Sequence, residues 1–198
     1  MPTDERKKQW RAIKKFDQQD MVCCTLALAK RYLADFPDRG AAWLCFGVSL
    51  YAVARYTEAL TALRRAARLC PPKYIHLVQY HFGHLYKQKG NYRRAETWFR
   101  KAIASCPSDA DSYIFLGGLL ARDGRLSESE ATHRKGTLCE QGCIDEAFLN
   151  LGLVFRAQER YSEALSCFQR ALAIDPEYKE AKKQLSDVAH VIELTRNA

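Results

Sequence analysis

A five-residue fingerprint recurs along this chain every 34 to 36 residues and constrains its fold more than any other feature. Each copy starts at a glycine, followed by Ala after twelve residues, a large apolar residue after sixteen, Ala after nineteen and Pro after twenty-four. The three full copies are Gly47–Ala59–Leu63–Ala66–Pro71, Gly83–Ala95–Phe99–Ala102–Pro107 and Gly152–Ala164–Phe168–Ala171–Pro176. A degenerate copy starts at Gly117. Self-similarity at this period is typical of a solenoid, in which each unit packs only on its neighbours.

Each period is predicted to contain two amphipathic helices. Around the starting glycine, which we call the anchor, apolar residues recur at spacings of three and four, as on one face of a helix. A glycine inside a helix costs about 1 kcal/mol, so its recurrence indicates that the second helix crosses closely there. Gly90 and Gly124 follow their anchors by seven residues and are expected to end the first helix in a left-handed conformation. The proline ends the second helix.

This spacing resembles the tetratricopeptide repeat family. The resemblance implies an all-α fold, namely a right-handed superhelical solenoid of antiparallel helix pairs with a C-terminal capping helix. We expect one repeat domain over residues 1–198. Its expected parts are a partial repeat (1–39), three repeats (40–75, 76–109 and 145–176), a degenerate repeat (110–144) and a capping helix (177–198). Residues 10–16 would supply the first helix of the partial repeat, in a register that fits the repeat poorly.

The degenerate repeat departs from the fingerprint at every position after its glycine. It has Ser129, His133, Gly136 and Gln141 where the other repeats have Ala, a large apolar residue, Ala and Pro. A histidine in a core position and a glycine inside the helix should weaken the second helix by about 1–3 kcal/mol in total. Tolerated sequence drift explains this more simply than a functional hinge, because local weakness alone does not indicate regulated motion.

The composition of the chain indicates the cellular compartment in which it is expected to fold. The sequence has no run of about 20 apolar residues, so no membrane span is expected. Its first residues, MPTDERKKQW, are charged and lack the apolar segment of a secretory signal. The eight cysteines have no paired spacing, and a chain with a sizeable core does not need a disulfide framework. We therefore expect reduced thiols and a cytoplasmic location.

No catalytic or cofactor-binding motif occurs in the sequence, so we expect a non-enzymatic protein without a cofactor. The residues nearest to a metal site are Cys45, His81 and His84, which the repeat register places on one side of the first helices. A fourth ligand is missing. Polar lining of a groove is the simpler interpretation, and no metal site is predicted.

In the family, the face of the first helices opposite the core lines a concave surface that usually holds another polypeptide. By the repeat register, the corresponding residues here are Leu44, Cys45, Val48, Tyr80, His81, His84, Ile114, Phe115, Gly118, Leu149, Asn150 and Leu153. Contiguous exposed apolar side chains mark an interaction site, so we expect a peptide-binding groove. Lys87, Arg122 and Arg156 end the first helices and would form a basic rim that favours acidic residues beside apolar anchors.

Two alternatives remain open from the sequence. The net charge of +8 includes a ladder of basic pairs, which could hold nucleic acid or an acidic protein. The ladder pairs are Lys30–Arg31, Arg64–Arg65, Arg100–Lys101, Arg134–Lys135 and Gln169–Arg170. Nucleic acid is disfavoured, because exposed aromatic residues are not interleaved with these charges. The chain could also form a homo-oligomer in which a terminal helix of one molecule fills the groove of the next.

Overall fold

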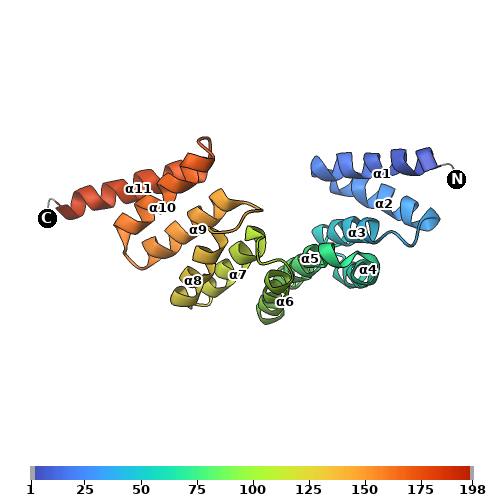
Figure 1. Ribbon diagram of the computed structural model, residues 1–198, viewed down its shortest axis with the longest axis horizontal. Helices are drawn as coiled ribbons and strands as arrows, with labels where there is room; N and C mark the ends of the chain where they lie inside the picture. The colour runs from blue at the N-terminus through green and yellow to red at the C-terminus, as the bar shows by residue number, and fades with distance from the viewer. Residues whose placement is uncertain (1–2, 197–198) are drawn as a thin grey trace. The chain divides into compact units, whose positions relative to one another are not determined.

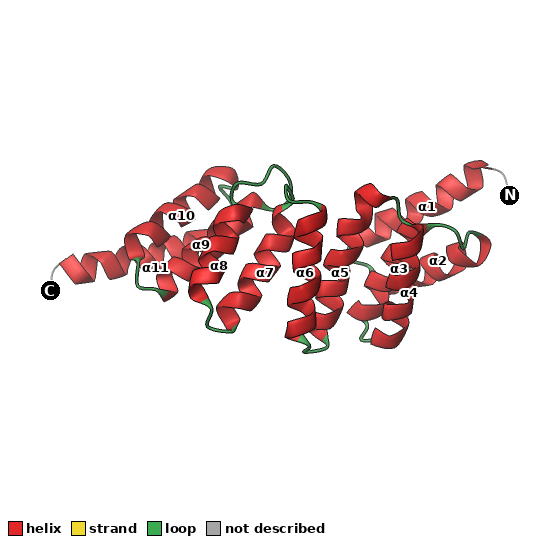
Figure 2. Ribbon diagram, turned by 60° about the horizontal axis from the view of Figure 1, so that its bottom comes forward, coloured by secondary structure: helices red, strands yellow, loops and turns green. Residues whose placement is uncertain are grey.

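The computed structural model describes residues 3–196, and the regular secondary structure within this range is helical (Figures 1 and 2). The elements are α1 (Thr3–Gln18), α2 (Val22–Asp35), α3 (Gly40–Ala52), α4 (Tyr56–Leu69), the 3₁₀ turn η1 (Pro72–Tyr74), α5 (Ile75–Gln88), α6 (Tyr92–Ser105), α7 (Ala110–Arg122), α8 (Leu126–Gly136), α9 (Ile144–Ala157), α10 (Tyr161–Ile174) and α11 (Lys179–Arg196). The predicted all-α solenoid of helix pairs is confirmed. We call α1, α3, α5, α7 and α9 the first helices and α2, α4, α6, α8 and α10 the second helices.

The anchor glycines lie where the two helices of a repeat cross. A Cβ atom on Gly47 would lie 2.9 Å from Leu63, and one on Gly83 would lie 2.6 Å from Phe99. The anchor Gly152 faces Phe168 in the same way. In each case the side chain sixteen residues later fills the space that a Cβ would take, which explains why a residue of low helix propensity recurs.

The first helix pair keeps the register of the repeat with different residues. Ile13 lies 34 residues before Gly47 and thus occupies the anchor position of α1. Its side chain is fully buried, and so is Ala29, which holds the position of Leu63 and Phe99. The large and the small residue have exchanged places, which conserves the volume available at the crossing. The expectation that α1 fits the repeat register poorly is therefore wrong.

The residue seven positions after each anchor has a left-handed backbone. Gly90 and Gly124 have φ angles of 72° and 75°, as expected for a glycine that ends the first helix. The same position of other repeats holds Asp20, Ala54 and Glu159, with φ angles of 52°, 60° and 60°. The connection between the paired helices therefore requires this conformation even where the residue has a side chain.

The chain divides into two compact units, residues 1–102 and 103–198. Unit 1 has an apolar core around Leu63 and Phe82, and unit 2 has one around Phe155 and Phe168. In unit 2, α11 packs on α10 and contributes Ala181 and Val188 to the core. It therefore covers the last helix pair, as predicted for a capping helix.

All eight cysteines are free. Within the described range, no helix is both long enough and apolar enough to span a bilayer.

Candidate functional site

In unit 1, the first helices α3 and α5 carry the predicted groove residues at half-buried positions. Leu44, Cys45 and Val48 lie on α3, and Leu44 and Val48 pack at the edge of the unit 1 core. Tyr80, His81 and His84 lie on α5 and are half-buried as well. The repeat register thus brings one short row of apolar and aromatic side chains onto the same face of two helices that contact each other.

Tyr80 belongs to a packed group of rings, which we call the Tyr80 cluster. The Tyr80 ring lies 4.4 Å from the His84 ring and 5.1 Å from the His81 ring, and Phe99 of α6 lies 5.5 Å from His84. The Tyr51 hydroxyl and His81 Nδ1 share a hydrogen bond of 2.8 Å. These contacts hold the rings of the predicted groove residues in place. Tyr51 follows the anchor Gly47 by one helical turn and is not among the groove residues predicted from the sequence.

Burial keeps three titratable groups of this region, Cys45, Tyr51 and His81, uncharged near neutral pH. Burial lowers the pKa of His81 to about 3, with a smaller contribution from neighbouring His84. Burial also raises the pKa of the Cys45 thiol to about 12 and the pKa of the Tyr51 hydroxyl above its ordinary value. His81 therefore presents a neutral ring, and Cys45 presents a protonated thiol. Within residues 3–196, no three His, Cys, Asp or Glu side chains are grouped so that they could hold a metal ion.

In unit 2, the predicted groove residues divide into accessible and buried ones. Phe115, Asn150 and Leu153 are half-buried, and Gly118 is exposed with open space where a Cβ would lie. The expectation that Ile114 and Leu149 present accessible apolar surface is wrong. The two remain only 4% and 5% exposed.

The burial of Ile114 and Leu149 follows from contacts between neighbouring helix layers. Ile114 of α7 packs with Ala110 and with Ala147 of α9, because α7 and α9 lie against each other. Leu149 belongs to the unit 2 core cluster that also includes Ala181 of the capping helix. Both side chains are covered by other parts of the repeat stack. They are therefore packing residues in this structure.

The three predicted rim residues also differ from one another. Lys87 and Arg122 are in the last turns of α5 and α7, as expected, and their role in binding stays a prediction. Arg156 is half-buried, and its guanidinium donates to the Gln184 side chain and lies 3.3 Å from the Asp187 carboxylate of α11. Arg156 therefore ties the capping helix to α9. The expectation of a free rim charge at this position is wrong.

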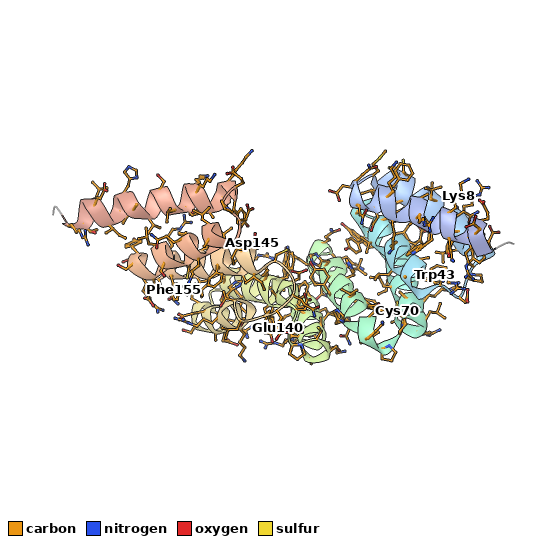
Figure 3. All side chains as sticks on the ribbon, turned by 45° about the horizontal axis from the view of Figure 1, so that its top comes forward. Lys8, Trp43, Cys70, Glu140, Asp145 and Phe155 are labelled. Carbon is orange, nitrogen blue, oxygen red and sulfur yellow. The ribbon has the colours of Figure 1, made fainter. Side chains whose placement is uncertain are left out.

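Several basic ladder residues lie against aromatic rings or carboxylates. Arg65 lies 4.6 Å from the Trp43 ring, and Lys101 lies 4.4 Å from the Trp98 ring. Arg134 lies 3.0 Å from Glu130 and also contacts the ring of Phe155. Figure 3 labels Trp43 and Phe155. These contacts anchor the side chains and reduce the charge available to a separate partner.

Unit 1 contains a cavity of about 740 Å³ that was not predicted from the sequence. Trp10 and Lys14 of α1, Leu44 of α3 and Leu77 of α5 line it. A signal was present in the sequence, because Ile13 lies 34 residues before Gly47 and Trp10 lies 34 residues before Leu44. The register of Ile13 therefore places Trp10 at the position corresponding to a predicted groove residue.

Comparisons with known proteins agree with this architecture. The tetratricopeptide repeat family matches residues 145–178, and a second description of the same repeat matches residues 78–109. The chain is 25% identical over 187 residues to anaphase-promoting complex subunit 6 of Arabidopsis thaliana, covering 74% of this chain and 34% of that protein. It is 28% identical over 161 residues to the human cell division cycle protein 16 homolog, covering 75% of this chain and 26% of that protein. The chain thus spans about a third or less of the length of these relatives.

Solved structures share the fold at low sequence identity. The hetero-tetramer Cut9–Hcn1 has a TM-score of 0.71 at 16% identity, covering 93% of this chain and 40% of that chain. TTC0263 of Thermus thermophilus has a TM-score of 0.69 at 16% identity, with coverages of 93% and 98%. YrrB, described as having an unusual peptide-binding site, has a TM-score of 0.58 at 19% identity, with coverages of 86% and 87%. The two matched segments identify tetratricopeptide repeats in this chain, and the solved structures share its fold.

Proposed function

We propose that this chain is a non-enzymatic scaffold that binds a peptide segment of a partner protein on the face of its first helices. The observation that carries the proposal is the row of half-buried Leu44, Val48 and Tyr80 on α3 and α5. Aromatic and aliphatic side chains that keep part of their surface exposed are suited to act as anchors for a ligand. The Tyr80 cluster holds its rings in place, which lowers the entropic cost of binding.

The similar proteins support a binding role by analogy. One relative is named as a subunit of the anaphase-promoting complex and another as a cell division cycle protein. The structural neighbour YrrB is described by its peptide-binding site. A fold alone does not determine function, and the binding role proposed for this chain depends on its first-helix face. Burial raises the pKa of Cys45 to about 12, which disfavours this thiol as a nucleophile, because a nucleophilic cysteine needs a lowered pKa.

The partner is a protein segment with apolar anchors, and Lys87 and Arg122 would favour acidic residues near them. A cytoplasmic location remains part of this proposal. Self-association is the main competing explanation for the same face, and the basic ladder is the competing surface. The engagement of Arg65, Lys101 and Arg134 by neighbouring rings makes the ladder the weaker candidate.

Selection from a random peptide library tests the proposal, followed by calorimetry with the selected peptides. We expect Tyr80→Ala and Val48→Asp each to weaken binding by about 1–3 kcal/mol, the usual range for a buried anchor. Leu138→Asp is the matched control, because Leu138 is 83% exposed in unit 2 and lies outside the first-helix face. Thermal unfolding of each variant checks that the fold is retained.

Two further measurements separate the competing surfaces. Binding to the first-helix face should weaken little with added salt, whereas binding to the basic ladder should collapse. Normal binding by Tyr80→Ala, with loss of binding on charge reversal at Arg64, Arg100 and Arg134, would contradict the proposal. Size-exclusion chromatography over a concentration series tests self-association.

A further inference from the structure

The cavity of unit 1 has the size of a ligand site. It occupies about 740 Å³, and ligand pockets typically measure about 300–1,000 Å³, so it has room for a large side chain together with neighbouring residues of a ligand. It is lined by residues of α1, the start of α3 and the segment that leads from α4 into α5. Cys70, which follows α4 and is labelled in Figure 3, is one of them. All of these elements belong to unit 1.

Apolar surface is concentrated around this cavity. Leu69, Tyr74 and Leu77 line it and are 41%, 45% and 38% exposed, although they are large apolar side chains. Trp10 and Leu44 line it as well and are half-buried. Single exposed apolar residues are common on protein surfaces, but several around one cavity indicate a surface that a partner covers.

The charges that line the cavity are mainly basic. Arg6, Lys7, Lys14 and Arg39 are present against a single acidic residue, Asp38. Asp38 lies 3.5 Å from Arg39 Nε, yet this buried nitrogen makes no hydrogen bond. Among the described residues, no carboxylate forms an ion pair with Arg6, Lys7 or Lys14.

This arrangement contrasts with the basic residues that begin the second helices. Arg55 binds Glu58 at 2.5 Å, and Arg160 binds Glu163, each within one turn of its own helix. Within the described residues, the positive charge of Arg6, Lys7 and Lys14 is not paired with a carboxylate in this way, although Arg39 lies beside Asp38 and Lys14 Nζ lies 5.9 Å from the Trp10 ring. This positive charge therefore remains available to attract a negatively charged ligand, and the attraction is strengthened where apolar walls exclude water.

We propose that the cavity receives an acidic peptide segment of a partner protein that inserts one large apolar side chain. The inserted side chain would contact Trp10, Leu44 and Leu77, while flanking Asp or Glu residues would pair with Lys7, Lys14 and Arg39. This inference rests on the proposed peptide-binding function and identifies where on the face the ligand is held and which chemistry it carries. Nucleic acid fits less well, because the lining is largely apolar and the basic groups surround one cavity.

The test uses the full chain and a panel of fluorescein-labelled synthetic peptides. The central residue is Phe or Ala, and the flanking residues are Glu or Gln, so that anchor and charge vary separately. We expect the peptide with Phe and Glu to bind, and the versions with Ala or Gln to bind at least about tenfold more weakly. Fluorescence anisotropy gives the dissociation constants.

Variants of the protein locate the binding. Leu77→Asp and the double variant Lys7→Glu/Lys14→Glu should each weaken the binding of the peptide with Phe and Glu about tenfold or more. Leu138→Asp and Lys135→Glu are the matched controls, because both residues are exposed on unit 2, and they should bind like the wild type. Circular dichroism during heating confirms that each variant is folded.

The outcomes distinguish this inference from the proposed function. Equal binding of the Glu and Gln peptides, or binding unaffected by Leu77→Asp, overturns the inference. If library peptides bind through Tyr80 and Val48 while no panel peptide binds, the proposed function stands and the acidic-anchor inference fails. Displacement of the labelled peptide by a single-stranded oligonucleotide of equal charge, but not by the unlabelled peptide with Phe and Glu, would assign the site to nucleic acid instead.

Discussion

The helix pairs α7–α8 and α9–α10 of unit 2 solve the same packing problem with different chemistry. In α9–α10 the apolar ring of Phe168 packs over the anchor Gly152. In α7–α8 the ring of His133 takes the same position over Gly117, and it is only 1% exposed. Ser129, at the position of Ala164, donates a hydrogen bond of 2.8 Å to the Gly117 carbonyl. Polar residues have thus entered the crossing without changing its geometry.

The two pairs differ in the hydrogen bonding of the ring at the crossing and in the length of the second helix. His133 Nδ1 is buried without a hydrogen-bond partner, and burial lowers the pKa of His133 to about 4. The second helix α8 has 11 residues, whereas α10 has 14. The comparison teaches that the shape of the side chain at the crossing is required, while its polarity affects the free energy of unfolding.

The largest effect is expected from a substitution that disrupts the close helix crossing, the feature that both helix pairs share. Gly152→Leu should lower the free energy of unfolding by about 3 kcal/mol, because its Cβ would overlap the Phe168 ring. Gly118→Leu is the control and should be near neutral, since nothing lies within 4 Å of a Cβ there. Urea titration measures both. Equal losses would contradict the helix register described above.

Exchanging the two rings should sharpen the comparison. Phe168→His should cost about 2–3 kcal/mol, because it buries a polar ring without partners and removes apolar contacts. His133→Phe should raise the free energy of unfolding by about 1 kcal/mol, since Phe already fills this position over Gly152. Both values come from the same urea titrations at neutral pH. Destabilisation by His133→Phe would show that the two crossings are not equivalent.

Acid should weaken the pair that contains histidine. Because the pKa of His133 is about 4 in the folded state and about 6.5 when unfolded, the unfolded chain binds more protons as the pH falls below 6.5. The free energy of unfolding should therefore decrease by about 2 kcal/mol between pH 7.5 and pH 5 from this residue alone. The His133→Phe variant should lose correspondingly less over this range. An identical pH dependence for variant and wild type would refute the assignment.

At the left-handed positions that follow the first helices, glycine is favoured over a residue with a side chain, and substitutions there should have a smaller effect on stability. Gly124 and Glu159 share a left-handed backbone with φ angles of 75° and 60°. Glu159→Gly should stabilise the protein by about 0.5–1 kcal/mol, and Gly124→Ala should destabilise it by about the same amount. Thermal unfolding followed by calorimetry resolves these changes. A loss of stability in Glu159→Gly would indicate that the Glu159 side chain stabilises the fold by more than its left-handed backbone destabilises it.

The smallest expected effect concerns Ser129. Ser129→Ala removes the hydrogen bond to Gly117, which contributes about 1 kcal/mol, and gains about 0.5 kcal/mol of helix propensity. The net loss should therefore be about 0.5 kcal/mol. A loss several times larger in urea titration would mean that the polar contact holds the α7–α8 crossing together. Ala164→Ser is the reciprocal control, because it introduces the same hydroxyl at the α9–α10 crossing.

The sequence predicted the fold in considerable detail because the constraints of a repeat are local. The spacing from anchor glycine to proline placed the crossings at Gly47, Gly83 and Gly152, and the structure confirms them. The second helices α4, α6 and α10 end before the expected prolines. The candidate site was predicted less well. Leu44, Val48 and Tyr80 remain partly accessible, whereas Ile114 and Leu149 are buried.

The sequence by itself determined the helix pairs, their register and the close crossings, because those depend on residues within one repeat. Tertiary structure decided which surface remains accessible. Ile114 is covered by a neighbouring first helix, Arg156 pairs with the capping helix, and Trp10 of α1 lines the cavity beside Leu44 of α3. Burial and charge pairing depend on what packs against a residue from other repeats, and a periodic pattern within one repeat carries no information about those neighbours.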